Sequence, residues 1–133
     1  IGSGANYEHL KKVCEVMLKY ALTMNQKISS ISAGGGLPIP YKFNEHPINI
    51  EKYFKIWNQT RKKISQYFKK NIQLEIEPGR FLVAESGILV AQVRTIKQMG
   101  KNNFVLINAG FNDLIRPTMY GSYHHISVIS GDN

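Results

Sequence analysis

The feature that most constrains this chain is an alternation of two amphipathic helical patterns with two short β-prone stretches, each of which ends abruptly at a glycine loop. Between residues 6 and 24 apolar side chains recur at three- and four-residue steps, which predicts a helix. Residues 28–33 then form a short strand that breaks at Gly34-Gly35-Gly36. This alternation, repeated through residue 80, is typical of a parallel α/β architecture, either a doubly wound sheet or an eight-stranded barrel.

The second helix and strand follow in the same order. Asn49 is a favourable N-cap, Ile48 and Tyr53 can form a hydrophobic staple, and the helix should run to about Lys70. Its expected buried face consists of Tyr53, Trp57, Ile64, Tyr67 and Phe68. Residues 72–77 alternate apolar and polar side chains, which predicts a strand that Pro78-Gly79 terminates.

The pattern changes near residue 86. Residues 88–99 and 104–108 are β-prone and flank a turn at residues 100–103, which predicts an antiparallel hairpin. Residues 111–125 have mixed chemistry and are predicted to be an irregular loop, where functional side chains often lie. We therefore expect one structural part over residues 1–86 and another over residues 87–133.

Composition places the chain among soluble globular proteins. Hydrophobic residues make up 43% of its 133 residues and charged residues 20%, and no apolar stretch approaches the roughly 20 residues needed to cross a bilayer. Cys14 is the only cysteine, so an internal disulfide is excluded, and a reducing compartment, the cytoplasm, is expected. Its place on the apolar stripe of the first helix predicts a core residue rather than a reactive thiol.

The net charge of +8 raises the alternative of a nucleic-acid-binding domain. The lysines and arginines, however, are interleaved with the apolar stripes of the two predicted helices, as expected of solvated faces, so no nucleic-acid partner is predicted. A metal site is not expected either, because the adjacent His124 and His125 cannot share a helical face as ligands.

The two glycine loops are candidates for binding an anion. Backbone N–H groups freed by consecutive glycines can approach a phosphate closely, although glycines also form tight turns for steric reasons alone. Arg80, directly after Gly79, adds a fork of donors at the end of the next strand, so both loops should lie at one sheet edge. Glu77, the last residue of that strand, either forms a salt bridge with Arg80 or a lysine, or faces the ring nitrogen of a cofactor.

Four strings in order give the chain a specific resemblance. They are Ile1-Gly2-Ser3-Gly4, residues 32–37, residues 74–81 and residues 108–117, with residues 119–124 behind them. Together they resemble the diaminopimelate decarboxylase family, whose members bind pyridoxal phosphate in an alanine-racemase-like barrel followed by a β domain. The resemblance implies that residues 1–86 are the last βα units of a TIM-type (β/α)8 barrel that binds pyridoxal 5'-phosphate. Residues 87–133 would begin the C-terminal antiparallel β domain.

The resemblance also implies the site. The residues implied around the cofactor are Ser3, Gly35, Gly36, Glu77, Pro78, Gly79 and Arg80, with Glu77 facing the pyridine nitrogen. The implied substrate contacts are Arg80, Arg116 and Tyr120, and two cationic groups suit a substrate that bears carboxylates. The implied reaction, part of lysine biosynthesis, converts meso-2,6-diaminopimelate into L-lysine and carbon dioxide, and a homodimer is implied as well.

The resemblance has limits within these residues. The family's Schiff-base lysine and its later cysteine have no counterpart here, so we expect a fragment that holds no catalytic residue and is inactive alone. Asn108 stands where the family more often has aspartate. Two alternatives remain, a related decarboxylase acting on ornithine, arginine or carboxynorspermidine, and a non-catalytic regulatory relative.

Overall fold

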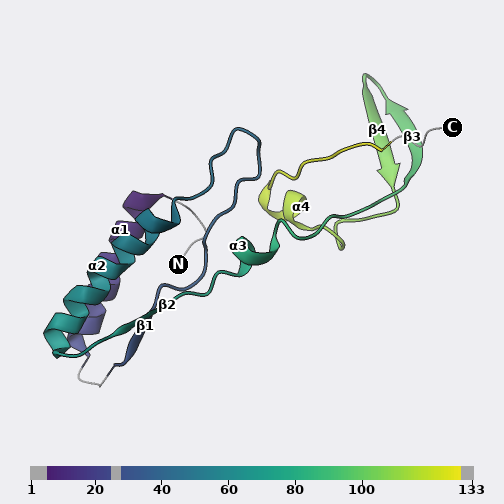
Figure 1. Cartoon of the computed structure of the whole chain (residues 1–133). Coiled ribbons are helices and arrows are strands. Elements are labelled where there is room, and N and C mark those ends of the chain that lie inside the picture. The colour runs from purple at the N-terminus through teal and green to yellow at the C-terminus, as the bar shows by residue number, and fades with distance from the viewer. Residues whose placement is uncertain (1–5, 25–27, 130–133) are drawn as a thin grey trace. The chain divides into compact units, whose positions relative to one another are not determined.

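The computed structural model describes residues 6–24 and 28–129, which belong to two compact units (Figure 1). Unit 1 comprises Ile1–Pro40 and His46–Ser86, and unit 2 comprises Tyr41–Glu45 and Gly87–Asn133. The elements in chain order are α1 (Tyr7–Thr23), β1 (Ser30–Ser32), α2 (Ile50–Phe68), β2 (Gln73–Glu75), α3 (Gly79–Val83), β3 (Val93–Met99), β4 (Asn102–Ile107) and α4 (Arg116–Tyr120).

Asparagine side chains begin both long helices. Asn6 Oδ1 accepts the N–H groups of Glu8 and His9 at 2.9 and 3.3 Å, and Asn49 Oδ1 accepts that of Lys52 at 2.8 Å. Each cap satisfies N–H groups that have no partner inside the helix, which stabilises a helix by about 1 kcal/mol. The predicted helices and the predicted Asn49 cap are confirmed.

Strands β1 and β2 form a parallel pair in unit 1. Ile31 lies opposite Leu74 in the ladder, and Ala33 N–H donates to the carbonyl of Glu75 at 2.8 Å beyond it. The strands are shorter than predicted, three residues each. The described strands form this sheet and one antiparallel pair, so the predicted α/β class is confirmed with small sheets, and the described residues contain no closed barrel.

The core of unit 1 lies between the helix pair and the parallel strands, with α1 and α2 side by side in Figure 1. Two clusters of buried side chains form it, Cys14, Ala33, Leu37, Tyr53 and Trp57 in one and Ala21, Ile31, Ile64 and Ile72 in the other. The predicted core places of Cys14 and Trp57 are confirmed. Each cluster contains residues from both helices and from the strand region. The apolar face of each helix is therefore buried only when the other helix and the strands are in place.

The predicted buried face of α2 needs one correction. Tyr67 is 60% exposed, whereas Thr60, not predicted, is buried. The buried stripe steps by four, three and four residues from Tyr53 to Ile64, and the next step of four reaches Phe68 rather than Tyr67. Tyr67 is left at the edge of the stripe, its ring edge-on to that of Phe68 with centroids 5.0 Å apart.

In unit 2, the predicted antiparallel hairpin is confirmed, since β3 pairs with β4 across a turn at Gly100. That glycine has φ of 61°, in the left-handed region that favours glycine. Residues 88–92 lie outside the ladder, so the first strand begins later than predicted. Asn108 ends the hairpin: its Oδ1 accepts Gln92 N–H at 2.7 Å, a contact that an aspartate oxygen could equally make.

The prediction of an irregular loop over residues 111–125 is wrong in part, because α4 lies within it. Pro117 lies in the first turn of α4, where backbone N–H groups have no acceptor within the helix, so the N–H that proline lacks is not missed. Gly121 ends the helix with φ of 58° and donates its N–H to the carbonyl of Pro117 at 3.0 Å. Pro117 thus lies in the first turn of α4, and Gly121 ends the helix.

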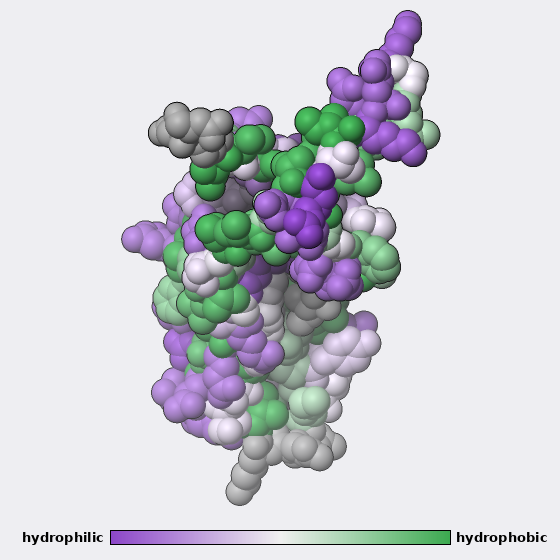
Figure 2. All heavy atoms as spheres, turned by 90° about the vertical axis from the view of Figure 1, so that its right-hand side faces the viewer, coloured by the Kyte–Doolittle hydropathy of each residue, from purple (hydrophilic) through white to green (hydrophobic). Residues whose placement is uncertain are grey.

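Many large apolar side chains of unit 2 are exposed, among them Ile88, Ile96, Phe111 and Val128. Figure 2 shows hydrophobic residues in green at the surface between hydrophilic ones. No helix among the described residues is long and apolar enough to cross a membrane.

The packing of α2 predicts a contrast between two of its positions. Ile64→Ala removes a fully buried side chain and should destabilise the fold by about 2–5 kcal/mol. Tyr67→Ala, on the same helix but exposed, should change stability by less than about 0.5 kcal/mol. The midpoint of thermal unfolding, followed by circular dichroism, measures both, and equal shifts would contradict the assignment of the two clusters as the core.

Burial also sets the reactivity of Cys14. Desolvation raises the pKa of this thiol above its ordinary value, so less of the reactive thiolate forms at neutral pH. We expect Cys14 in the folded protein to resist iodoacetamide at pH 7.5 and to react once the protein is unfolded in guanidinium. Peptide mapping by mass spectrometry measures the alkylated fraction, and rapid labelling of the native protein would show that the thiol is accessible.

Candidate functional site

The loops that follow β1 and β2 touch each other at the carboxyl ends of the strands. Glu77 N–H donates to the carbonyl of Gly34 at 3.0 Å. A Cβ added at Gly35 would lie 2.9 Å from the carbonyl oxygen of Glu77, closer than real Cβ contacts. Gly34 and Gly36 have φ of 68° and 92°. The three glycines are therefore required by close approach and by left-handed backbone, and they fix two loops against each other.

The carboxylate of Glu77 is held by Ser32, the last residue of β1. Ser32 Oγ donates to Glu77 Oε1 at 2.6 Å and accepts the N–H of Gly34 at 2.9 Å. One hydroxyl thus connects the carboxylate to the glycine loop. Sequence reasoning gave Ser32 no role; its position two residues before the first glycine was the signal available. The side chain of Glu77 remains exposed, so a ligand could reach it.

The adjoining loops leave hydrogen-bond donors for an anion. Among the described residues, the N–H groups of Gly35 and Gly36 have no hydrogen-bond partner. Helix α3 begins at Gly79, beside which no described atom lies within 4 Å of the place a Cβ would take. Arg80, in the first turn of α3, is half-buried. Free amides, a helix start and a guanidinium group form an arrangement suited to a phosphate or carboxylate.

Arg116 is the first residue of α4 in unit 2. Its Nη1 donates to the hydroxyl of Tyr41 at 2.9 Å and lies 3.3 Å from Nε2 of His124. Its guanidinium carbon lies 4.9 Å from the centre of the Tyr41 ring. Tyr120, four residues on in the same helix, is 71% exposed. The structure gives Arg116 a definite orientation and leaves Tyr120 accessible.

The predicted site residues fall into two groups. Gly35, Gly36, Glu77, Pro78, Gly79 and Arg80 lie on the adjoining loops of unit 1, and Arg116 and Tyr120 lie on α4 of unit 2. Ser3 lies outside the described residues. In the described part of the chain, no three or more His, Cys, Asp and Glu side chains gather as metal ligands would.

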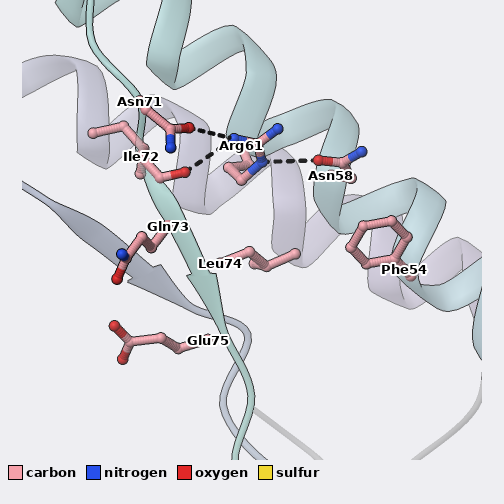
Figure 3. A pocket seen from close by; sticks show the side chains of 8 residues that line it. All are labelled: Phe54, Asn58, Arg61, Asn71, Ile72, Gln73, Leu74 and Glu75. Carbon is pink, nitrogen blue, oxygen red and sulfur yellow. Dashed lines mark hydrogen bonds between the residues drawn. The ribbon is translucent and has the colours of Figure 1, made fainter.

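A shallow depression of about 420 Å3 lies elsewhere in unit 1, between α2 and β2 (Figure 3). Arg61 crosses its wall, where the guanidinium group donates to Asn58 Oδ1 at 2.8 Å and to Asn71 Oδ1 and the Ile72 carbonyl at 3.0 Å each. These bonds fix the connection between α2 and β2. None of the predicted site residues lines this depression, so we assign it a structural role.

The comparison with protein families decides the class. The model of the "Pyridoxal-dependent decarboxylase, C-terminal sheet domain" family matches residues 13–133. The chain belongs to the pyridoxal-dependent decarboxylases. The resemblance predicted from the four strings is thereby confirmed.

Individual decarboxylases agree with this assignment. The diaminopimelate decarboxylase of Buchnera aphidicola from Acyrthosiphon pisum is 69% identical over the whole chain, which spans 32% of that relative. A crystal structure of diaminopimelate decarboxylase superposes with a TM-score of 0.89 at 53% identity, over 94% of this chain and 30% of that one. The crystal structure of the M. jannaschii diaminopimelate decarboxylase in complex with L-lysine superposes with a TM-score of 0.79 at 29% identity, over 93% of this chain and 29% of that one. The chain thus spans about a third of the length of its relatives.

The contact between the loops predicts an effect of a single methyl group. Gly35→Ala should push the Glu77 carbonyl away and destabilise the fold by about 1–3 kcal/mol, the usual cost of overpacking. Gly87→Ala is the control, because nothing lies within 4 Å of its added Cβ. The midpoint of thermal unfolding should fall for the first variant and not for the second; a fall of equal size in both would mean that the loops are not held in contact.

Proposed function

We propose that this chain is part of a longer protein that decarboxylates meso-2,6-diaminopimelate to L-lysine and carbon dioxide with pyridoxal 5'-phosphate. The support is the identity of 69% with a relative named diaminopimelate decarboxylase over the whole chain. A similar structure holds L-lysine, which would be the product of this reaction. The reaction belongs to lysine biosynthesis, and we propose the cytoplasm as its place.

The proposal includes the architecture of the longer protein. Residues 1–86 would supply the last βα units of a (β/α)8 barrel, and residues 87–133 the start of the antiparallel β domain. Parallel pairing of β1 with β2 supports the first part, and the antiparallel hairpin of β3 and β4 supports the second. A homodimer is proposed from the family resemblance.

The geometry that carries the proposal is the contact of the Gly34–Gly36 loop with Glu77, in the loop that follows β2. The residues fit a phosphorylated pyridine: free N–H groups at Gly35 and Gly36 and the guanidinium of Arg80 would bind the phosphate. From the family resemblance we propose Ser3, Pro78 and Gly79 as further cofactor contacts. The carboxylate of Glu77, oriented by Ser32, would hold a proton on the pyridine nitrogen. When bound, the cofactor supplies the electron sink that decarboxylation requires.

The substrate would be held by cationic groups and one phenol. Arg80, Arg116 and Tyr120 would contact the substrate, the two arginines by pairing with carboxylates. The Schiff-base lysine and a catalytic cysteine implied by the family lie outside these 133 residues, so the isolated chain should be inactive. The chain would contribute groups that bind and orient the cofactor and the substrate and that keep the pyridine nitrogen protonated. It would form no covalent bond with either.

Turnover by the full-length protein tests this function. With pyridoxal 5'-phosphate added, we expect carbon dioxide release from meso-diaminopimelate and none from ornithine, arginine or carboxynorspermidine. Consumption of one of these other amines instead would identify a related decarboxylase. Absence of turnover with all four, together with a missing Schiff-base lysine upstream, would identify a non-catalytic relative.

The role of Glu77 predicts a separation of cofactor binding from rate. Glu77→Gln keeps the shape and removes the charge, so kcat should fall about 100- to 1,000-fold, as is typical for the loss of a preorganised electrostatic contact. Cofactor occupancy, measured by absorbance, should change little. Glu75→Gln, two residues earlier at the end of β2, is the matched control and should keep full activity. Near-normal kcat in Glu77→Gln would exclude the proposed contact with the pyridine nitrogen.

A further inference from the structure

The orientation of Arg116 depends on two side chains to which nothing above gives a role. We propose that Tyr41 and His124 are positioning residues that present the free edge of the Arg116 guanidinium to a substrate carboxylate. This inference rests on the proposed function, since it takes Arg116 to be a substrate contact. It adds that the affinity of that contact is set by residues that do not touch the substrate.

Both partners contact the same nitrogen of Arg116. Nη1 donates to Tyr41 Oη at 2.9 Å, and His124 Nε2 lies 3.3 Å from the same atom. A guanidinium group only donates, so a hydrogen bond in this contact needs His124 Nε2 as its acceptor. The hydroxyl and the imidazole thus both lie at the Nη1 end of the guanidinium group.

The opposite edge of the guanidinium group is left for an anion. Among the described residues, Nε and Nη2 of Arg116 have no hydrogen-bond partner, and no carboxylate forms an ion pair with the side chain. This pair of N–H groups is the fork that binds a carboxylate through two parallel bonds. Neither partner of Nη1 is a carboxylate, so the positive charge of Arg116 is not compensated by an ion pair there. The positive charge of Arg116 at the start of α4 is not stabilised by the helix dipole, because the dipole favours negative charge at that end.

Ring contacts restrict the remaining freedom of the group. The Arg116 guanidinium carbon lies 4.9 Å from the Tyr41 ring centre, and the Tyr41 and His124 rings meet edge to face at 5.7 Å. An arginine side chain loses considerable rotamer freedom when it is fixed in a complex. For Arg116 this loss of rotamer freedom occurs when the protein folds, so substrate binding would not have to fix the side chain again.

Tyr41 reaches this place because residues 41–45 form a closed turn within unit 2. Tyr41 N–H donates to Glu45 Oε2 at 2.7 Å, and Glu45 N–H donates to the Lys42 carbonyl at 3.0 Å. The Phe43 and His125 rings lie edge to face at 5.1 Å. Ring contacts of Tyr41 and Phe43 thus link the turn to the segment that follows α4, with Tyr41 beside Arg116.

The test uses the full-length protein loaded with pyridoxal 5'-phosphate. Tyr41→Phe keeps the ring and removes the acceptor, and it should raise the KM for meso-diaminopimelate about 10-fold, the size of a lost hydrogen bond to a charged group. His124→Leu should act similarly, whereas His124→Gln, which retains an acceptor, should recover most of the affinity. Cofactor absorbance should be unchanged in all three. Tyr67→Phe, the same change on an exposed tyrosine of α2 that has no hydrogen-bond partner among the described residues, is the matched control.

A double-mutant cycle separates positioning from general damage. If Tyr41 acts through Arg116, Tyr41→Phe should have less than about a 2-fold effect in an Arg116→Ala background. An equal effect in both backgrounds, or an unchanged KM in Tyr41→Phe, overturns the inference.

A second readout, the Kd for L-lysine measured by calorimetry, separates this inference from the proposed function. We expect Tyr41→Phe to weaken L-lysine binding about 10-fold with Arg116 present and not in its absence. If the wild type binds L-lysine but does not decarboxylate diaminopimelate, the proposed function fails while these affinities still decide the role of Tyr41. A wild type that does neither overturns both.

Discussion

The site depends on one backbone contact, the approach of the Gly34–Gly36 loop to Glu77 in the loop that follows β2. The hydrogen bond from Glu77 N–H to the Gly34 carbonyl, and the absence of a Cβ at Gly35, join two loops from parallel strands. Without that approach, Ser32 would not reach the Glu77 carboxylate, and the Gly35 backbone would not lie against the Glu77 carbonyl. The proposed cofactor site is therefore a property of the strand pairing rather than of either loop alone.

The two proposed binding groups use charge in the same way. Glu77 is held by a hydroxyl, and Arg116 by a hydroxyl and an imidazole, so each charged side chain is oriented by neutral partners. A neutral partner fixes direction without compensating the charge, which stays available to a ligand. Arg61 also has neutral partners, but its bonds use both Nε and Nη1 and join Asn58 of α2 to Asn71 and the Ile72 carbonyl, so they connect parts of unit 1.

Much of the fold could be predicted from the sequence, because helical periodicity and asparagine caps are local signals. The hairpin followed from β-prone runs around Gly100, and the contact of the two glycine loops follows from parallel strands that end at one edge. The short helix α4 was missed because proline and glycine disrupt the interior of a helix, whereas Pro117 lies in its first turn and Gly121 at its end, where both residue types are favourable. Tyr41 could not be assigned, since its contact with Arg116 spans 75 positions and leaves no periodic trace in the sequence.

The most direct test of the account is an experimental structure of the full-length protein with pyridoxal 5'-phosphate and L-lysine bound. The account predicts the phosphate at hydrogen-bond distance, about 3 Å, from the amides of Gly35 and Gly36, and Glu77 at the same distance from the pyridine nitrogen. It further predicts the Nε–Nη2 edge of Arg116 on a carboxylate. A phosphate bound away from both glycine loops, or a Glu77 carboxylate turned away from the ring, would contradict it.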